Sequence, residues 1–199
     1  MFFLYQILIS LVVLFSPLII IFRIIKNKED KIRFREKFCF FSKKRGKGKL
    51  IWFHGASVGE ILSIIPLIYE YEKNKSVNKI LITTNTLSSS KVIQKYKFKK
   101  TVHQFFPIDQ IYFTSKFLEY WKPHIAIFID SEIWPNMTRV LNNKNIPLIL
   151  LNARITKRSF DRWTKLKKFS RYIFEKITIA YPQNTETKYF LKKLKLNKI

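Results

Sequence analysis

The sequence predicts an α/β protein in which an N-terminal transmembrane helix precedes a doubly wound, mainly parallel sheet. Two observations support this fold class. Residues 1–22 carry no charged side chain, and beyond residue 49 short apolar runs alternate with longer segments of helical periodicity. Such alternation is typical of repeated strand and helix units. At 199 residues the chain is long enough for one such domain and a tether, which divides it into residues 1–22, 23–49 and 50–199.

Residues 1–22 are long enough, as a helix, to cross the hydrocarbon core of a bilayer, which is about 30 Å thick. A cleaved signal peptide is the alternative, but it needs a basic start and a small-residue cleavage site, and the sequence has neither. By the positive-inside rule, the basic residues that follow predict a single-pass protein of the inner (cytoplasmic) membrane with the rest of the chain in the cytosol. These residues are also expected to lie against anionic lipids. They are Arg23, Lys26, Lys28, Lys31, Arg33, Arg35 and Lys37.

Strands are expected where apolar residues run without interruption, because the strands of a parallel sheet are buried on both faces. They are residues 50–53, 80–84, 102–106, 125–129, 148–151 and 177–180, the first of which follows a basic loop at residues 42–49. Helices are expected between and after them, at residues 60–73, 88–96, 111–121, 135–143, 159–174 and 185–194. Right-handed crossovers then bring the carboxyl ends of the strands to one edge, where ligands of such sheets bind.

Polar side chains follow the predicted strands at this edge. Glu60 opens the helix after the first strand, where the helix dipole stabilises a negative charge and a carboxylate can act as a general base. Gly55 and Gly59 allow a tight turn and a close approach to the backbone. Any one polar residue here can be a helix cap, but their convergence indicates a polar cleft. The candidate site residues are Ser57, Gly59, Glu60, Asp130, Glu132, Trp134, Asn136 and Arg154.

The net charge of +25 indicates anionic partners such as phospholipid head groups, phosphorylated lipid or nucleic acid. The abundance of Lys, Ile, Asn and Phe is also what AT-rich coding produces without selection for binding. Because a membrane anchor and a polar sheet edge account for the basic residues, no nucleic-acid partner is expected. The single cysteine, Cys39, excludes a disulfide within the chain. Three scattered histidines and the lack of a glycine-rich phosphate loop predict neither a metal nor a cofactor.

Six motifs occur in order along the chain: residues 57–60, 83–86, 107–109, 131–136 and 151–159, and Gln183 before the last helix. Together they resemble the N-terminal half of the 3-deoxy-D-manno-octulosonic acid (Kdo) transferases of lipopolysaccharide synthesis, a family of membrane-bound inverting glycosyltransferases with two Rossmann-like domains (the GT-B fold). The resemblance covers the whole chain. It implies that residues 50–199 are the acceptor-side Rossmann-like domain. It also implies that the second, nucleotide-binding domain is missing here, either because it is a separate chain or because this sequence is a fragment.

The resemblance further implies metal-independent transfer of Kdo, with inversion, from CMP-Kdo to a lipid A precursor. Glu60 matches the catalytic base of the family. Asp130 stands where the family usually has a glutamate implicated in stabilising the transition state, and its side chain is one methylene shorter. Substrate binding is expected of Ser57, Gly59, Glu132, Trp134, Asn136 and Arg154.

Two other functions are compatible with parts of the sequence. A non-catalytic, membrane-tethered module that binds phosphorylated lipid fits the anchor and the charge. A serine hydrolase fits the Gly-x-Ser-x-Gly pattern around Ser57, and Asp109 and His124 follow in the order of a triad. The hydrolase is disfavoured because the pattern follows the first strand instead of a central one, and because His124 precedes a strand at the far end.

Overall fold

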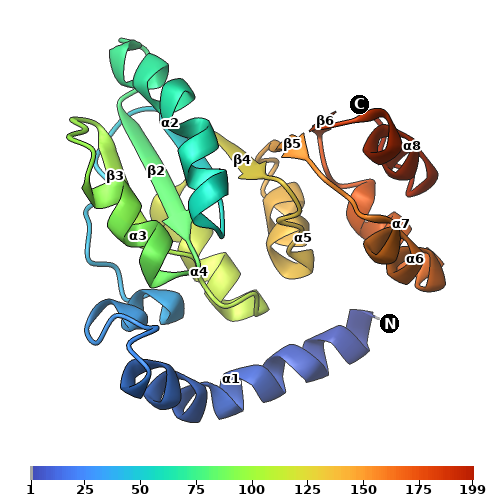
Figure 1. Ribbon diagram of the computed structural model, residues 1–199, viewed down its shortest axis with the longest axis horizontal. Helices are drawn as coiled ribbons and strands as arrows, with labels where there is room; N and C mark the ends of the chain where they lie inside the picture. Colours follow the sequence, from blue (N-terminus) through green and yellow to red (C-terminus); the bar gives the residue numbers. More distant parts are fainter. Residues whose placement is uncertain (1) are drawn as a thin grey trace.

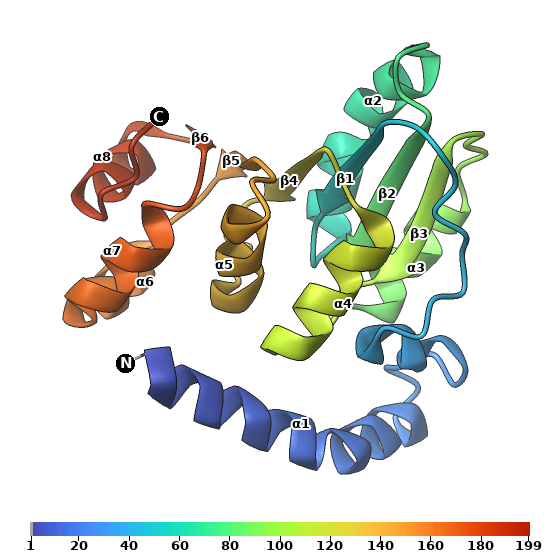
Figure 2. The ribbon, with the colours of Figure 1, turned by 180° about the vertical axis from the view of Figure 1, so that it is seen from behind.

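A six-stranded parallel sheet forms the centre of the protein, with helices on both of its faces (Figures 1 and 2). The computed structural model describes residues 2–199. The strands lie in the order β3-β2-β1-β4-β5-β6, and every neighbouring pair is parallel. This confirms the doubly wound arrangement that the alternation predicts. The strands are β1 (Leu50–His54), β2 (Lys79–Thr84), β3 (Thr101–Phe105), β4 (Ile125–Ile129), β5 (Leu148–Ala153) and β6 (Ile179–Pro182).

The helices lie where the periodicity places them, with one exception. The expected helix over residues 159–174 is two helices, because the chain leaves helical geometry at Leu166. The break lets the second helix bury Phe169, Ile173 and Phe174 while the first stays at the surface. The helices are α1 (Phe2–Ile25), α2 (Val58–Lys73), α3 (Leu87–Gln94), α4 (Ile111–Trp121), α5 (Pro135–Asn143), α6 (Lys157–Lys165), α7 (Lys167–Phe174) and α8 (Thr185–Lys193), and a 3-10 helix, η1, spans Arg33–Phe38.

Strand β1 shows how the sheet separates two hydrophobic cores. Leu50 and Trp52 point into one core, which also receives side chains from α4, α5, α7 and α8. Ile51 and Phe53 point into the other, together with residues of α2 and α3. Side chains alternate between the two faces of a strand, so an uninterrupted apolar run is what a strand buried on both faces requires. The sheet therefore holds the turns at its carboxyl edge on a rigid base.

Two buried carboxylates hold the basic segment that follows α1 in a folded form, and one of them, Glu36, also joins it to the domain. The side chain of Glu29 is fully buried and pairs with Arg23 at 2.9 Å and with Lys37 at 2.5 Å. Glu36 pairs with Arg33 at 2.8 Å and accepts a hydrogen bond of 2.9 Å from the backbone N–H of Phe105 in β3. Because β3 is an edge strand, η1 covers backbone groups that would otherwise be open to another strand.

These pairs correct part of the expectation that the basic segment lies against lipid. Three of its seven basic residues are bonded to buried carboxylates within the protein, and they are Arg23, Arg33 and Lys37. The remaining four are exposed, and they are Lys26, Lys28, Lys31 and Arg35. The segment is thus a folded connection with a smaller exposed basic surface.

The apolar helix α1 lies across the ends of α4 and α5 and reaches the neighbourhood of α6 and α7 (Figures 1 and 2). It has 24 residues and is long and apolar enough to cross a membrane, which is evidence from length and composition only. Its first turns are bonded to the domain: the hydroxyl of Tyr5 donates to Asp109 Oδ2 at 2.6 Å, and the amide of Gln6 donates to Asn136 Oδ1. In this structure α1 is therefore packed along the domain that it was expected to tether.

We expect the stability of the fold to depend on pH through His103 in β3. Arg33 donates to its Nδ1 at 2.9 Å, so the proton is on Nε2, which donates to the hydroxyl of Thr84 at 2.9 Å. Burial, and then the charge of Arg33, lowers the pKa of His103 to about 3. An unfolded histidine has a pKa near 6.5, so the unfolded state binds more protons and stability is lost as the pH falls below about 6.5.

Between pH 7 and pH 5 this linkage lowers the free energy of unfolding by about 2 kcal/mol. The difference between the parent and His103→Gln in urea unfolding, recorded in detergent at both pH values, measures it. His103→Gln can keep both hydrogen bonds and should lose this part of the pH dependence, whereas His124→Gln, at an exposed histidine, should keep it. Equal pH dependence in the parent and in His103→Gln would contradict the assignment.

Candidate active site at the carboxyl edge of the sheet

The turn between β1 and α2 fixes the carboxylate of Glu60 at the first turn of the helix. Ser57 is the N-cap: its hydroxyl accepts from the backbone N–H of Glu60 at 3.2 Å and donates to Glu60 Oε1 at 2.6 Å. The backbone N–H of Ala56 donates to Glu60 Oε2 at 2.8 Å. This reciprocal capping resembles the capping box, and it holds the carboxylate in one orientation while leaving it partly exposed.

The two glycines of this turn have different roles. A Cβ atom at Gly55 would lie 3.2 Å from Cβ of Glu60 and 3.1 Å from Cδ1 of Ile61. The side chains of α2 therefore pack closely against the backbone of Gly55. A side chain at Gly59 would meet nothing within 4 Å. Gly59 is therefore not required by the protein's own packing, and it leaves open space beside Glu60 that a ligand can enter.

The loop between β4 and α5 brings Asp130 next to the loop after β5. Asp130 has a φ of +61°, in the left-handed region, where aspartate and asparagine occur more readily than most residues. The hydroxyl of Ser131 lies 2.8 Å from Asp130 Oδ1 and 2.6 Å from the carbonyl oxygen of Arg154. The side chain of Arg154 itself is exposed at this edge.

Glu132 and Trp134 form a second group with a histidine that the sequence did not assign to the site. Glu132 Oε2 accepts from Trp134 Nε1 at 2.8 Å and lies 3.0 Å from His54 Nε2. His54 is fully buried at the end of β1, and its Nδ1 lies 3.0 Å from the hydroxyl of Thr83. The ring also stacks on Phe106 with centroids 3.9 Å apart. The buried histidine thus positions the carboxylate of Glu132; its place directly after the first predicted strand was the signal available in the sequence.

Asp109 caps helix α5 from a distant loop. Its two carboxylate oxygens accept from the backbone N–H groups of Asn136 and Met137 at 3.0 and 2.8 Å, and Tyr5 of α1 bonds to it as well. Burial raises the pKa of Asp109 to about 6, although the hydrogen bonds from Tyr5, Asn136 and Met137 partly lower it. The N-cap position itself, Trp134, makes no capping hydrogen bond with its side chain, so Asp109 takes over that role.

The same junction corrects the expectation that Asn136 binds substrate. Asn136 is fully buried, and its amide is bonded to the carbonyl oxygen of Asp109 and to Gln6. It therefore joins α1 to α5 and has no surface for a ligand. The other candidate residues lie at the carboxyl edge in three groups: Ser57, Gly59 and Glu60 after β1; Asp130, Glu132 and Trp134 after β4; and Arg154 after β5.

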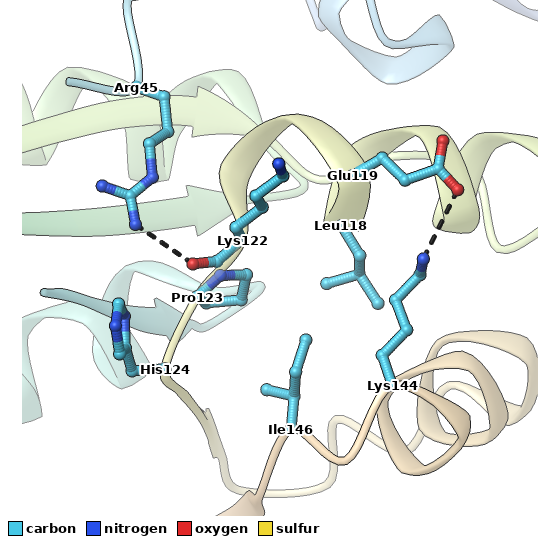
Figure 3. A pocket seen from close by; sticks show the side chains of 8 residues that line it. All are labelled: Arg45, Leu118, Glu119, Lys122, Pro123, His124, Lys144 and Ile146. Atoms are coloured by element: carbon cyan, nitrogen blue, oxygen red, sulfur yellow. Dashed lines mark hydrogen bonds and ion pairs between the residues drawn. The ribbon is translucent and has the colours of Figure 1, made fainter. Parts of the chain in front are cut away.

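A cavity of about 490 Å³ lies at the opposite end of the sheet, where β4 begins, and three of its charged side chains are already paired (Figure 3). Arg45 donates to the backbone carbonyls of Trp121 and Lys122, and Lys144 pairs with Glu119 at 3.4 Å. Ligands of doubly wound sheets bind at the carboxyl edge, so we do not assign the site to this cavity. Within residues 2–199, no group of three or more His, Cys, Asp or Glu side chains could hold a metal ion.

The three residues proposed for a hydrolase triad, Ser57, Asp109 and His124, do not bond to one another, and each has a different structural role. Ser57 donates to Glu60, Asp109 caps α5, and His124 lies before β4, where its Nδ1 accepts from the backbone N–H of Leu50. The expectation that the Gly-x-Ser-x-Gly pattern does not follow a central strand is wrong, because β1 lies between β2 and β4 in the middle of the sheet. The positions of Asp109 and His124 exclude the triad instead.

A family model for 3-deoxy-D-manno-octulosonic-acid transferase (kdotransferase) matches residues 32–199. The chain is 37% identical over 166 residues to a 3-deoxy-D-manno-octulosonic acid transferase of Rickettsia bellii, covering 83% of this chain and 40% of that protein. It is 27% identical over 179 residues to one from Haemophilus influenzae, covering 88% of this chain and 42% of that protein. The chain thus spans about two fifths of these relatives. A crystal structure of UDP-N-acetylglucosamine 2-epimerase shares the fold, with a TM-score of 0.55 and 12% identity over 75% of this chain and 46% of that one.

We expect Asp109→Ala to destabilise the protein strongly. The substitution leaves the buried N–H groups of Asn136 and Met137 without an acceptor, and each unsatisfied buried donor costs about 1–3 kcal/mol. The free energy of unfolding, measured with urea in detergent, should therefore fall by at least about 2 kcal/mol. Asp161→Ala, at an exposed aspartate of α6, is the matched control and should change little. An unfolding midpoint equal to that of the parent would show that Asp109 does not hold α5.

Proposed function

Because the chain belongs to the 3-deoxy-D-manno-octulosonic-acid transferase family, we propose that it forms the acceptor-side half of an enzyme that transfers Kdo from CMP-Kdo to a lipid A precursor in lipopolysaccharide synthesis. The observation that carries this proposal is the carboxylate of Glu60, held at the open first turn of α2 on the ligand edge of the sheet. The relatives that the chain matches are more than twice its length, so the activity is proposed for the whole enzyme.

In the proposed reaction Glu60 is the general base. An ionised carboxylate offers about four acceptor positions, and Ala56 and Ser57 occupy two of them. The remaining lone pairs can accept the proton of a sugar hydroxyl that approaches over Gly59, where nothing of the protein fills the space. As the proton leaves, the hydroxyl oxygen attacks the anomeric carbon of Kdo from the side opposite the leaving phosphate. This single displacement inverts the configuration and needs no metal ion.

The capping bonds give Glu60 an advantage as a base. Its orientation is set before the acceptor arrives, so little reorganisation is needed at the moment of proton transfer. General-base catalysis of this kind contributes about 10²–10⁴-fold, and the rest of the rate must come from positioning and from stabilising the developing charge.

The other residues of the edge are proposed to bind and orient the substrates. Arg154 is exposed and can pair with a phosphate of the acceptor. Asp130 is assigned to stabilising the transition state, while Glu132 and Trp134 present a carboxylate and an indole to the sugar. The nucleotide of CMP-Kdo is proposed to bind mainly to a second domain, and anionic lipids of the cytoplasmic leaflet are the other partners.

The test is the substitution Glu60→Gln in this chain joined to the C-terminal half of a family member. A glutamine can still accept the N–H of Ala56, so the cap and the fold should persist, but the amide cannot take a proton. We expect the rate of Kdo transfer to fall at least about 100-fold. The matched control is Glu70→Gln at the other end of α2, whose side chain is 69% exposed.

Equal urea midpoints for the two variants would show that the loss is catalytic. If Glu60→Gln were as fast as the parent, Glu60 would not be the base. If neither the parent nor its variants transferred Kdo while the chain still bound lipid A precursor, the non-catalytic lipid-binding module would be the better description.

A further inference from the structure

A cleft of about 400 Å³ opens beside the candidate site, between the loop after β4 and helices α6 and α7. We call it the aromatic groove, because most of its lining is aromatic or aliphatic. Arg162 is the charged residue among the side chains that line it. The lining includes Trp134, Ser159, Arg162, Trp163, Leu166 and Phe169. A largely apolar cleft with a few polar groups is typical of sites for small molecules, which measure about 300–1,000 Å³.

The break between α6 and α7 builds this groove. Residues at the spacing i, i+3, i+4 and i+7 place one face of α6 toward it, and they are Ser159, Arg162, Trp163 and Leu166. After the break, α7 buries Phe169. The indole of Trp163 stacks on Phe169 with ring centroids 6.1 Å apart and meets Phe174 edge-on at 5.3 Å. The core thus holds this indole in place, while the residue itself is only half-buried.

Two polar groups of the groove have no partner in the protein. Among residues 2–199, neither the hydroxyl of Ser159 nor the guanidinium of Arg162 makes a hydrogen bond or an ion pair. The surface of α6 is positive because three further cations lie on the same helix, and they are Lys157, Arg158 and Lys165. The groove therefore offers an anion both a favourable potential and unoccupied hydrogen-bond donors.

We infer that the aromatic groove holds a phosphorylated sugar of the acceptor. The planar guanidinium of Arg162 can give a phosphate two parallel N–H hydrogen bonds, and the hydroxyl of Ser159 can give another. The C–H faces of a sugar ring are apolar and fit against the indoles of Trp134 and Trp163. An acyl chain fits the groove less well, because it would make no use of the charge of Arg162. The inference rests on the proposed function and deepens it by naming the group that is recognised.

Trp134 connects the groove to the proposed base. Its Nε1 donates to Glu132 at 2.8 Å, and Glu132 lies 3.0 Å from His54 at the end of β1. Strands β1 and β4 are neighbours, and neighbouring strands lie about 4.8 Å apart. Since β1 leads into the turn that carries Glu60, an acceptor held in the groove by one sugar presents the next sugar to Glu60. The phosphate thus determines which acceptors the site holds in a productive position.

Binding can be measured by NMR with the full chain in detergent, isotopically labelled at its tryptophan indole nitrogens. Glucosamine 1-phosphate is added to about 50 mM, because a fragment of this size binds weakly. We expect the indole signals of Trp134 and Trp163 to shift. Trp52 and Trp121 are fully buried, so their signals should not move and serve as internal references. Glucosamine without a phosphate should shift none of the signals at the same concentration.

Arg162→Gln removes the cation and should weaken the binding of glucosamine 1-phosphate at least about 10-fold, because hydrogen bonds to a charged group are lost. Its side chain is exposed, so the fold should persist. The matched control is Lys157→Gln, at an exposed cation of the same helix that does not line the groove. In the chain joined to the C-terminal half of a family member, Arg162→Gln should also raise the KM for lipid A precursor at least about 10-fold.

Three results would overturn the inference: no shift of either indole, equal binding by Arg162→Gln and the parent, or an equal response to inorganic phosphate alone. A response to decanoate but not to glucosamine 1-phosphate would also overturn it, since the occupant would then be an acyl chain.

Failure of the proposed function would look different. If the joined enzyme transferred no Kdo while glucosamine 1-phosphate still bound through Arg162, the reaction would be wrong and the groove would stand. If the joined enzyme transferred Kdo while no indole shifted, the groove would be wrong and the reaction would stand.

Discussion

One buried carboxylate, that of Asp109, connects the apolar helix α1 to the α/β domain at the carboxyl edge of the sheet. It satisfies the free N–H groups at the start of α5, which no side chain at the N-cap does, and it accepts the hydroxyl of Tyr5 from the apolar helix. The loop that carries it follows β3 at the carboxyl edge. The helix after β4, the ligand edge and the apolar helix therefore meet at this side chain, and the bond between Gln6 and Asn136 joins α1 to α5 a second time.

Residues at helix N-termini in the candidate site have both a structural role and a proposed functional role. Glu60 completes the cap of α2 and is also the proposed base, and Trp134 stands at the N-cap of α5 while its indole bonds to Glu132. A residue at the start of a helix has a fixed backbone and lies beside N–H groups that have no partner within the helix. Such a position suits carboxylates and anionic ligands. Structural and functional roles are thus compatible at the same position.

The sequence predicts the elements of this fold well because they depend on local patterns. Most strands are short, largely apolar runs and every crossover helix has its own periodicity, so the main features missed were the break at Leu166 and the 3-10 helix η1. The strand order is not local, which is why β1 was wrongly taken to lie away from the centre. The roles of His54, Glu36 and Asn136 depend on partners 78, 69 and 130 residues away along the chain, and no local pattern contains them. By contrast, the cap joins Ser57 and Glu60, which are only three positions apart, and can be predicted directly from the sequence.

The bond between Tyr5 and Asp109 joins residues 104 positions apart. During synthesis at about 5–20 residues per second, roughly 5–20 s therefore pass between the appearance of the apolar helix and that of its partner on the domain. For that interval α1 has no protein surface to cover its polar side chains, whereas its apolar face can already enter lipid. The apolar helix is thus made before the surface on which it packs, and the domain is assembled afterwards against an element that already exists.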